Sequence, residues 1–497
     1  MSVIASAALP ATRLARIRAW ADRRPGLVAA GVIFGVYAVH MLTSRGVVFL
    51  YDDGYYWKMA HQYWQTGAFE FQSFDSSLRG YLFPLLLAPL AWLEFTYQLA
   101  PAVLTRLLGA AVAALLFGVV GPGLWRAALP AGEATPPVSW PRRLAFGAMG
   151  LVCWRGYFNY PLTDFPALLA LSGGLWALLR GRSVGHGLLA GLLVAAAVNF
   201  RPVYLAALPL AGLLCLWPRP AARHRRLGTE WGRRLAFGAG LALVGWGQLR
   251  INQHHFGADT PLVLARLPGS ANLFITQLQM GLCNQKYETA EAVDHPAPQM
   301  FFGDPAGQAL WQRSGPPTLT TAAEYLALVR EAPAVVAGVW GRHLFNALDV
   351  QYPTPYVERV YVPTWGLAWA NYTLLGGGLW VLACRTARAA AARRRWPPVP
   401  GLLALGALLL PCLAVLPVLV ECRFMLPLHL LLCAALAFGA QPRAAWQRRR
   451  AGARLALLAL YAGWVVGAFA LSANAQLQLE RQPRRLFTWQ GLAPKPW

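Results

Sequence analysis

Two adjacent carboxylates, Asp52 and Asp53, are the residues whose type and position best suit chemistry. They lie in the segment VVFLYDDGYYWKMAHQYWQTG, residues 47–67, directly after the first long apolar run of the chain. Ionised groups are costly close to a bilayer and usually mark function there. Either aspartate could instead cap a following helix, whose free backbone amides favour a carboxylate. A cap needs only one aspartate, so we expect the pair to serve a reaction, with capping alone as the alternative.

The residues after this pair have the spacing of an amphipathic helix. Apolar and aromatic side chains recur at i, i+3, i+4, i+7 and i+8, at positions Tyr56, Met59, Ala60, Tyr63 and Trp64. Polar side chains, including Lys58, occupy the opposite face. An aromatic helix of this kind lies in the plane of the membrane interface. We therefore expect it to hold both aspartates level with the lipid headgroups.

Further polar and charged residues recur where the predicted spans leave the membrane at the same face. They are Asn159, Thr163 and Asp164 after the third span, Arg201 after the fifth, Glu421 and Arg423 after the ninth, and Arg79 before a short apolar helix. Each could be an ordinary boundary residue. Arginine binds phosphate through forked hydrogen bonds, and carboxylates accept protons or bind metal ions. Together these residue types fit a reaction on a phosphate-bearing lipid at the outer face.

The composition indicates that membrane helices position these residues. The 497 residues are 57% hydrophobic and only 13% charged, whereas soluble globular chains carry roughly 25% charged residues. Apolar runs such as PGLVAAGVIFGVYAVHML have about the length that a helix needs to cross roughly 30 Å of hydrocarbon. The net charge of +24 lies in short arginine bursts between these runs. This pattern argues against nucleic-acid binding and for contact with anionic membrane lipids.

The arginine bursts also predict the topology, because basic loops stay on the cytoplasmic side. The short apolar piece at 80–95 would break the alternation if it crossed, so we expect it to lie in the interface. We expect eleven transmembrane helices, at about 25–44, 99–125, 144–158, 165–180, 186–200, 203–217, 235–250, 362–384, 400–420, 424–440 and 455–474. The chain then divides into a cytoplasmic N-terminus (1–24), a transmembrane catalytic module (25–250) that includes the first external loop (45–98), an external segment (251–361), C-terminal transmembrane helices (362–474) and an external tail (475–497).

The external segment is the only stretch between predicted spans that is long enough for a soluble subdomain. It holds nearly half of the chain's 20 acidic residues. Its composition is mixed, with Pro- and Gly-rich loops and a predicted helix from Thr321 to Arg330. Apart from this small subdomain, the sequence predicts an all-α polytopic membrane protein.

Five stretches of the chain resemble the GT-C superfamily of membrane glycosyltransferases, which use polyprenyl-phosphate sugars. They are YDDGYYWKMAHQYWQTGAFEF, RGYLFPLLLAPL, NYPLTDFPALLAL, NFRPVYL and ECRFMLPLHLLL. In that superfamily the first external loop carries an acidic pair followed by an interfacial helix, and a second acidic residue follows the third span. The opening DDGYYW is most similar to bacterial arabinofuranosyl- and mannosyltransferase-type members. The resemblance implies a GT-C-like fold.

The resemblance also implies a reaction and roles for the residues. A sugar would move from a polyprenyl-phosphate donor to a hydroxyl of a glycan, lipid or protein acceptor, at the periplasmic face of the bacterial inner membrane. Asp52 is the expected general base, Asp53 shares the role or positions the acceptor, and Asp164 orients the acceptor or holds a divalent cation. The expected donor-binding residues are Arg201, Arg423, Lys58, Arg79, Tyr55, Asn159 and Glu421. No spacing of His and Cys indicates zinc, so a metal ion is optional and no other cofactor is expected.

A lipid or polysaccharide transporter, or a flippase, is the alternative function. Transporters often show internal repeats, paired broken helices and polar groups near the middle of the membrane. This sequence shows no internal repeat, and its charged residues gather at one predicted face. We therefore favour glycosyl transfer over transport.

Overall fold

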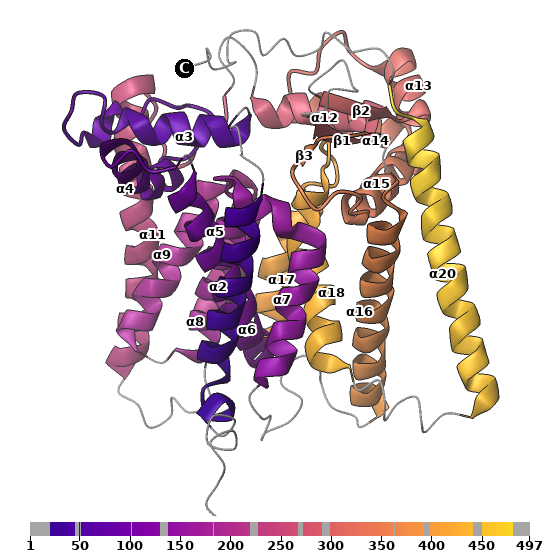
Figure 1. The fold of residues 1–497 in the computed structure, drawn as a ribbon. Coiled ribbons are helices and arrows are strands. Elements are labelled where there is room, and N and C mark those ends of the chain that lie inside the picture. Colours follow the sequence, from indigo (N-terminus) through magenta and orange to yellow (C-terminus); the bar gives the residue numbers. More distant parts are fainter. Residues whose placement is uncertain are drawn as a thin grey trace, which may run out of the picture.

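Apolar helices run side by side through the computed structural model (Figure 1). It describes residues 20–44, 49, 51–100, 102–129, 138–181, 183–218, 227–266, 272–290, 299–360, 363–391, 398–440 and 450–480. Among these residues, 5 helices are long and apolar enough to cross a membrane: Pro25–Thr43, Val103–Ala128, Trp365–Ala391, Cys422–Gly439 and Ala451–Leu477. The predicted helical architecture is confirmed, and the apolar helices are consistent with a membrane protein.

Each predicted span coincides with a helix or with a continuous helical stretch. In chain order these are α2 (Pro25–Thr43), α5 (Val103–Leu115) continued by η2 (Leu116–Val120) and α6 (Gly121–Ala128), α7 (Trp140–Trp154), α8 (Asp164–Arg180), α9 (Val184–Phe200), η4 (Pro202–Ala207) with α10 (Leu208–Leu216), α11 (Leu227–Phe256), α16 (Trp365–Ala391), α17 (Val399–Ala414), η6 (Cys422–Met425) with α18 (Leu426–Ala434) and η7 (Ala435–Gly439), and α20 (Ala451–Leu477). Several of these helices are shorter than the bilayer requires, so the eleven crossings and the GT-C fold stay predictions.

Small residues allow α9 and α11 to pack closely. A Cβ atom on Gly191 would lie 2.1 Å from the carbonyl oxygen of Phe237, and one on Gly187 would lie 2.2 Å from that of Arg233. Such close approach through small residues is typical of helix pairs in membranes. The two helices therefore pack tightly against each other. α9 also carries Asn199, which contacts the chain before α4.

Two helices lie across one end of the bundle, where the first external loop was predicted (Figure 1). They are α3 (Asp52–Gln62) and α4 (Leu82–Thr96), which pack against each other. Asn199 of α9 accepts a hydrogen bond from the backbone amide of Leu82 (2.9 Å) through its side-chain oxygen. A Cβ atom on Gly80 would lie 2.0 Å from the backbone oxygen of Asn199, so only glycine fits there. This contact fixes where the chain before α4 lies.

The external segment adds a three-stranded sheet to the helical fold. The strands are β1 (Asn284–Ala290), β2 (Gln299–Gly303) and β3 (Tyr356–Val357), in the order β2-β1-β3. β1 is antiparallel to β2 and parallel to β3. The sequence did not predict the sheet. β1 is rich in polar residues, so it lacks the apolar alternation that would indicate a buried strand.

Four helices accompany the sheet: α12 (Leu273–Cys283), α13 (Pro305–Ser314), α14 (Ala322–Glu331) and α15 (Pro333–Leu348). α14 confirms the predicted helix from Thr321 to Arg330. Thr321 and Glu324 form a capping box at its start, which satisfies free amides of the first turn.

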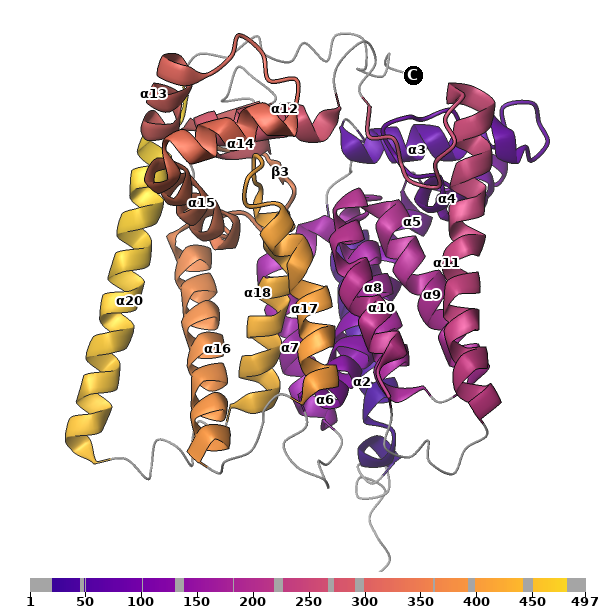
Figure 2. The same cartoon turned by 180° about the vertical axis from the view of Figure 1, so that it is seen from behind.

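Helices α3 and α4 lie at the same end of the bundle as the residues of the predicted external segment (Figures 1 and 2). The last described residues also lie there, because Leu479 bridges to Phe302 and the amide of Glu480 donates to the Phe301 carbonyl (2.9 Å). This arrangement agrees with the predicted alternation, while the side that faces the cytoplasm stays a prediction. Residues 1–19 and 481–497, which make up most of the predicted N-terminus and tail, lie outside the described residues.

Candidate active site

Asp52 begins α3 and lies between two arginines from distant parts of the chain. Its Oδ1 is 2.6 Å from Nη2 of Arg79, and its Oδ2 is 3.3 Å from Nη2 of Arg423. Arg79 comes from the loop before α4, and Arg423 comes from η6. The N-cap position of α3 belongs to Tyr51, which forms no side-chain capping bond. The position of Asp52 therefore serves these ion pairs rather than a helix cap.

Asp164 begins α8 and joins the same group of charges. It forms an ion pair with Arg201, which follows the last residue of α9, and its Oδ2 is 3.7 Å from Nη1 of Arg423. Asp164 is only 2% exposed, and a buried carboxylate needs charged or hydrogen-bonding partners. The start of α8 and the end of α9 thus bring these two residues together.

Arg423 is the centre of the group because it touches three carboxylates. Besides Asp52 and Asp164, it pairs through Nε with Glu421, two residues before it. Glu421 also accepts a hydrogen bond from Oγ1 of Thr289 (3.3 Å). We call the six residues Asp52, Arg79, Asp164, Arg201, Glu421 and Arg423 the charged cluster.

The charged cluster contains equal numbers of carboxylates and guanidinium groups. Burial alone would raise the pKa of Asp52, but Arg79, Arg423 and Arg201 hold the pKa below its usual value. Burial raises the pKa of Glu421, and Arg423 opposes that effect. Asp52 is therefore ionised at neutral pH, and its side chain is 25% exposed, so a hydroxyl group can reach it.

Asp53 points away from the arginines and is fully buried. Its Oδ1 accepts hydrogen bonds from the hydroxyl of Tyr356 (2.6 Å) and from the amide of Tyr51 (3.0 Å). Its Oδ2 has no partner among the described residues. Burial raises the pKa of Asp53 to about 6, although the bond from Tyr356 opposes the change. The two neighbouring aspartates therefore have different electrostatic surroundings.

Three other predicted donor-binding residues lie apart from these ion pairs. Tyr55 lies beside the cluster, where burial and the charge of Asp52 raise the pKa of its hydroxyl to about 12. Asn159 is buried, and its side-chain oxygen has no partner within the described part of the chain. Lys58 is exposed on the outer face of α3 and forms no ion pair with any described residue. Of the three, only Tyr55 is shown beside the cluster.

Tyrosine and threonine side chains from the sheet complete the site, and sequence analysis missed them. Tyr287 of β1 hydrogen-bonds with Arg423 and Glu421, and Thr289, two residues later on the same face, bonds to Glu421. Tyr356 of β3 bonds to Asp53. In the sequence, only the spacing of Tyr287 and Thr289, two residues apart, could have indicated that one face of a strand contributes to the site.

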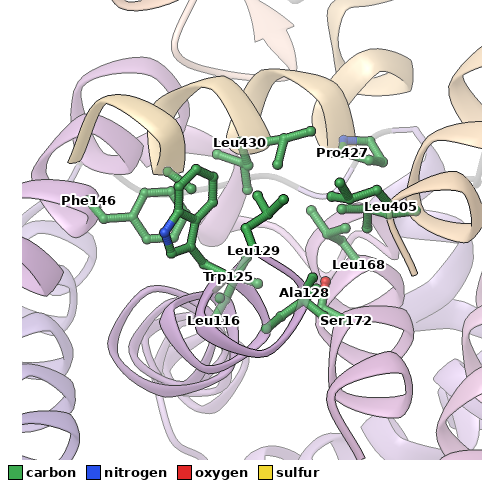
Figure 3. A pocket seen from close by; sticks show the side chains of 15 residues that line it. Leu116, Trp125, Ala128, Leu129, Phe146, Leu168, Ser172, Leu405, Pro427 and Leu430 are labelled. Atoms are coloured by element: carbon green, nitrogen blue, oxygen red, sulfur yellow. The ribbon is translucent and has the colours of Figure 1, made fainter. Parts of the chain in front are cut away.

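An apolar cavity lies between α6, α7, α8, α17 and α18 (Figure 3). Leu168 and Pro427, which line it, follow Asp164 and Arg423 by four residues, or about 6 Å along a helix. Trp125 lines it near the end of α6, and Ser172 is the polar residue in the lining. The cavity therefore begins beneath the charged cluster and extends toward the opposite end of the bundle.

The described residues contain no group of three His, Cys, Asp or Glu side chains that could hold a metal ion. Asp52 and Asp164 share Arg423 instead of facing each other across an open space. The optional divalent cation stays a prediction.

No family model matches the chain, and no curated protein matches it. The geometry offers guanidinium groups that can bind an anion, an ionised carboxylate that can accept a proton, and an apolar cavity close to both.

Proposed function

We propose that the protein is a membrane glycosyltransferase that moves a sugar from a polyprenyl-phosphate donor to an acceptor hydroxyl. The reaction would occur at the outer face of a bacterial inner membrane. The observation that supports this most is the meeting of three arginines and three carboxylates at one end of the bundle, directly above an apolar cavity. A lipid-linked phosphate needs both parts.

The donor phosphate would bind to the arginines of the cluster. Arg201 and Arg423 come from different helices and meet at Asp164. A phosphate can replace a carboxylate as the partner of a guanidinium group, because both present oxygens to its forked donors. The prenyl chain would then begin at the cavity lined by Leu168 and Pro427, which at about 50 Å³ has room only for the start of the chain. Burial of its methylene groups adds to the affinity.

Asp52 would act as the general base. The acceptor oxygen attacks the anomeric carbon while its proton passes to the Asp52 carboxylate. The bond between that carbon and the phosphate oxygen breaks, and the phosphate leaves with the bonding electrons. Arg201 and Arg423 stabilise the negative charge that develops on the leaving group. Asp53, fixed by Tyr356, positions the start of α3, and Asp164 orients the acceptor.

Transport is the alternative, and it would need polar groups open to a pathway through the bundle. Asn371 and His429 are buried polar residues within the helices. His429 bonds to the side-chain oxygen of Asn371 through Nε2 (2.8 Å) and accepts from Nε1 of Trp154 through Nδ1 (3.2 Å). Because these groups satisfy one another, they support packing rather than transport.

The test is sugar transfer by the purified full chain in nanodiscs. A panel of polyprenyl-phosphate sugars is supplied with short acceptors that bear free hydroxyl groups, and products are identified by mass spectrometry. We expect release of polyprenyl phosphate together with a glycosylated acceptor. Binding without turnover of any sugar, combined with movement of an intact lipid-linked sugar between leaflets, would favour transport instead.

A further inference from the structure

Three arginines gather at the end of the bundle opposite the charged cluster. Arg142 lies at the start of α7, and Arg385 and Arg388 lie in the last turns of α16. Both helices pack against η7. Among the described residues, Arg142 and Arg388 both lie close enough to Arg385 to repel it electrostatically. Three positive charges therefore lie close together around Arg385.

The partners of Arg142 and Arg388 do not neutralise this charge. Arg142 donates from Nη1 to the Phe438 carbonyl (2.5 Å) and from Nη2 to the Ala440 carbonyl (3.3 Å), which are uncharged acceptors. Arg388 is exposed. Neither forms an ion pair with any residue that the structure describes. Clustered cations at a membrane surface attract anions, and anionic lipid headgroups are the most abundant anions there.

Aromatic and apolar surface adjoins the three arginines. The Cζ atom of Arg385 lies 5.3 Å from the centre of the Trp125 ring. On α16, Trp380 and Arg388 are eight residues apart and therefore share one face. Trp380 is 41% exposed, so it adds aromatic surface to this face of α16. An acyl chain can follow this face away from Arg388.

We propose that Arg142, Arg385 and Arg388 bind one anionic phospholipid in the leaflet opposite the charged cluster. The phosphodiester would contact Arg142 and Arg388, and an acyl chain would lie along the face of α16 that carries Trp380. A zwitterionic lipid brings a compensating cation to the same place, so the site selects lipids with net negative charge. Arg142, Arg385, Arg388 and Trp380 have no role in the proposed glycosyl transfer, so this lipid site does not depend on whether transfer occurs.

The chain contains a matched control at the same end of the bundle. Arg234 also stacks on a tryptophan, with its Cζ atom 5.1 Å from the Trp231 ring, and donates to the Leu216 carbonyl (3.1 Å). Its neighbour Arg233, however, is already paired with Glu230 (3.2 Å). Glu230 therefore lowers the net positive charge around Arg234, so removal of Arg234 should not affect lipid selection.

The experiment is native mass spectrometry of the delipidated full chain, titrated with short-chain phosphatidylglycerol or phosphatidylcholine. We expect the wild-type protein to prefer phosphatidylglycerol. Arg388→Gln should weaken this binding about fivefold and Arg385→Gln/Arg388→Gln about twentyfold, since each surface arginine contributes a similar increment. Arg234→Gln should bind as the wild type does, and millimolar inorganic phosphate should not displace the lipid.

Several results would overturn the proposal. These are equal affinity for the two lipids, undiminished binding by the double variant, an equal loss in Arg234→Gln, or full displacement by phosphate, which would indicate a site for free phosphate. Arg388 is exposed, so its single variant should keep the wild-type melting temperature and separate loss of binding from loss of fold.

Discussion

Asp52 and Asp53 are adjacent in the chain, yet their side chains meet different partners. Asp52 lies between Arg79 and Arg423 and is held ionised. Asp53 is buried, bonded to Tyr356, and has a raised pKa. A base that accepts a proton from a hydroxyl must be ionised and reachable. At the scale of single residues, this comparison favours Asp52 over Asp53 as the proposed general base.

The first prediction is that Asp52→Asn lowers sugar transfer by at least about a hundredfold, because an amide cannot act as a base. Asparagine keeps the shape of the side chain, so the melting temperature should change little. Transfer by the purified variant in nanodiscs is the measurement, with Lys58→Gln as the control on the exposed face of α3. Full activity in a stable Asp52→Asn protein would remove the general-base assignment.

The second prediction concerns Arg201, which pairs with Asp164. Arg201→Gln should weaken donor binding roughly tenfold to a hundredfold, because a charge-assisted hydrogen bond contributes about 1.5–3 kcal/mol. Binding of a fluorescent polyprenyl phosphate measures this directly. If Arg201→Gln binds polyprenyl phosphate as tightly as the wild type does, Arg201 does not bind the donor phosphate.

The third prediction follows from the pKa of Asp53, which rises from 3.8 to about 6 in the folded protein. The folded state then holds the proton more tightly than the unfolded state, so the free energy of unfolding falls as pH rises between these values, by about 3 kcal/mol. In Asp53→Asn the side chain does not titrate, so this pH-dependent change in the free energy of unfolding is absent. The melting temperature of the variant, relative to wild type, should therefore increase from pH 4 to pH 7. A difference that stays constant over this range would contradict the raised pKa.

At the scale of elements, the charged cluster depends on where the chain enters α4. Gly80 lies against the backbone of Asn199, and the neighbouring Arg79 holds Asp52. The fourth prediction is that Gly80→Ala destabilises the protein by about 1–3 kcal/mol, the usual cost of overpacking, and lowers transfer because Arg79 is displaced. Gly212→Ala is the control, since nothing lies within 4 Å of its added Cβ atom. Thermal unfolding and transfer assays measure both effects, and equal behaviour of the two variants would show that the contact is unimportant.

Sequence reasoning predicted the helices well and the strands poorly, for a physical reason. The apolar runs and the interfacial helix carry their own periodic signal, and α3, α4 and α14 agree with it. β1 has the sequence NQKYETA, and most of its residues are buried on both faces. Its polar residues give no apolar alternation, and its pairing with β3 joins distant parts of the chain. Tyr287, Thr289 and Tyr356 could not be assigned to the site without that pairing.

At the scale of the whole molecule, the charged cluster lies against the external segment, because Thr289 of β1 bonds to Glu421 and Tyr356 of β3 bonds to Asp53 beside Asp52. Arg142, Arg385 and Arg388 lie at the other end of the bundle. The predicted carboxylates and arginines come from five separate stretches of sequence. Successive helices run in opposite directions, so the helix ends that carry these residues meet at one end of the bundle. The resemblance could suggest these residues, but only the packing shows that Arg423 joins three of them.

The fifth prediction tests the orientation of the molecule. A cysteine introduced in place of Arg313, which is exposed on α13, should react with a membrane-impermeant maleimide added to intact cells. A cysteine in place of Arg450, exposed before α20, should react only after the membrane is opened. The unsubstituted protein gives the background from native thiols. The reverse pattern would invert the topology.

The contact of residues 479–480 with β2 has a consequence for biosynthesis. β2 is an edge strand of its sheet, and its outer backbone groups meet Leu479 and Glu480, which the ribosome adds much later. During translation this edge stays uncovered until α20 has entered the membrane, and uncovered edges pair readily with other chains. This end of the bundle should therefore need protection by a chaperone until the last helix has inserted, and a nascent chain stalled before α20 should be a preferred substrate for membrane quality-control proteases.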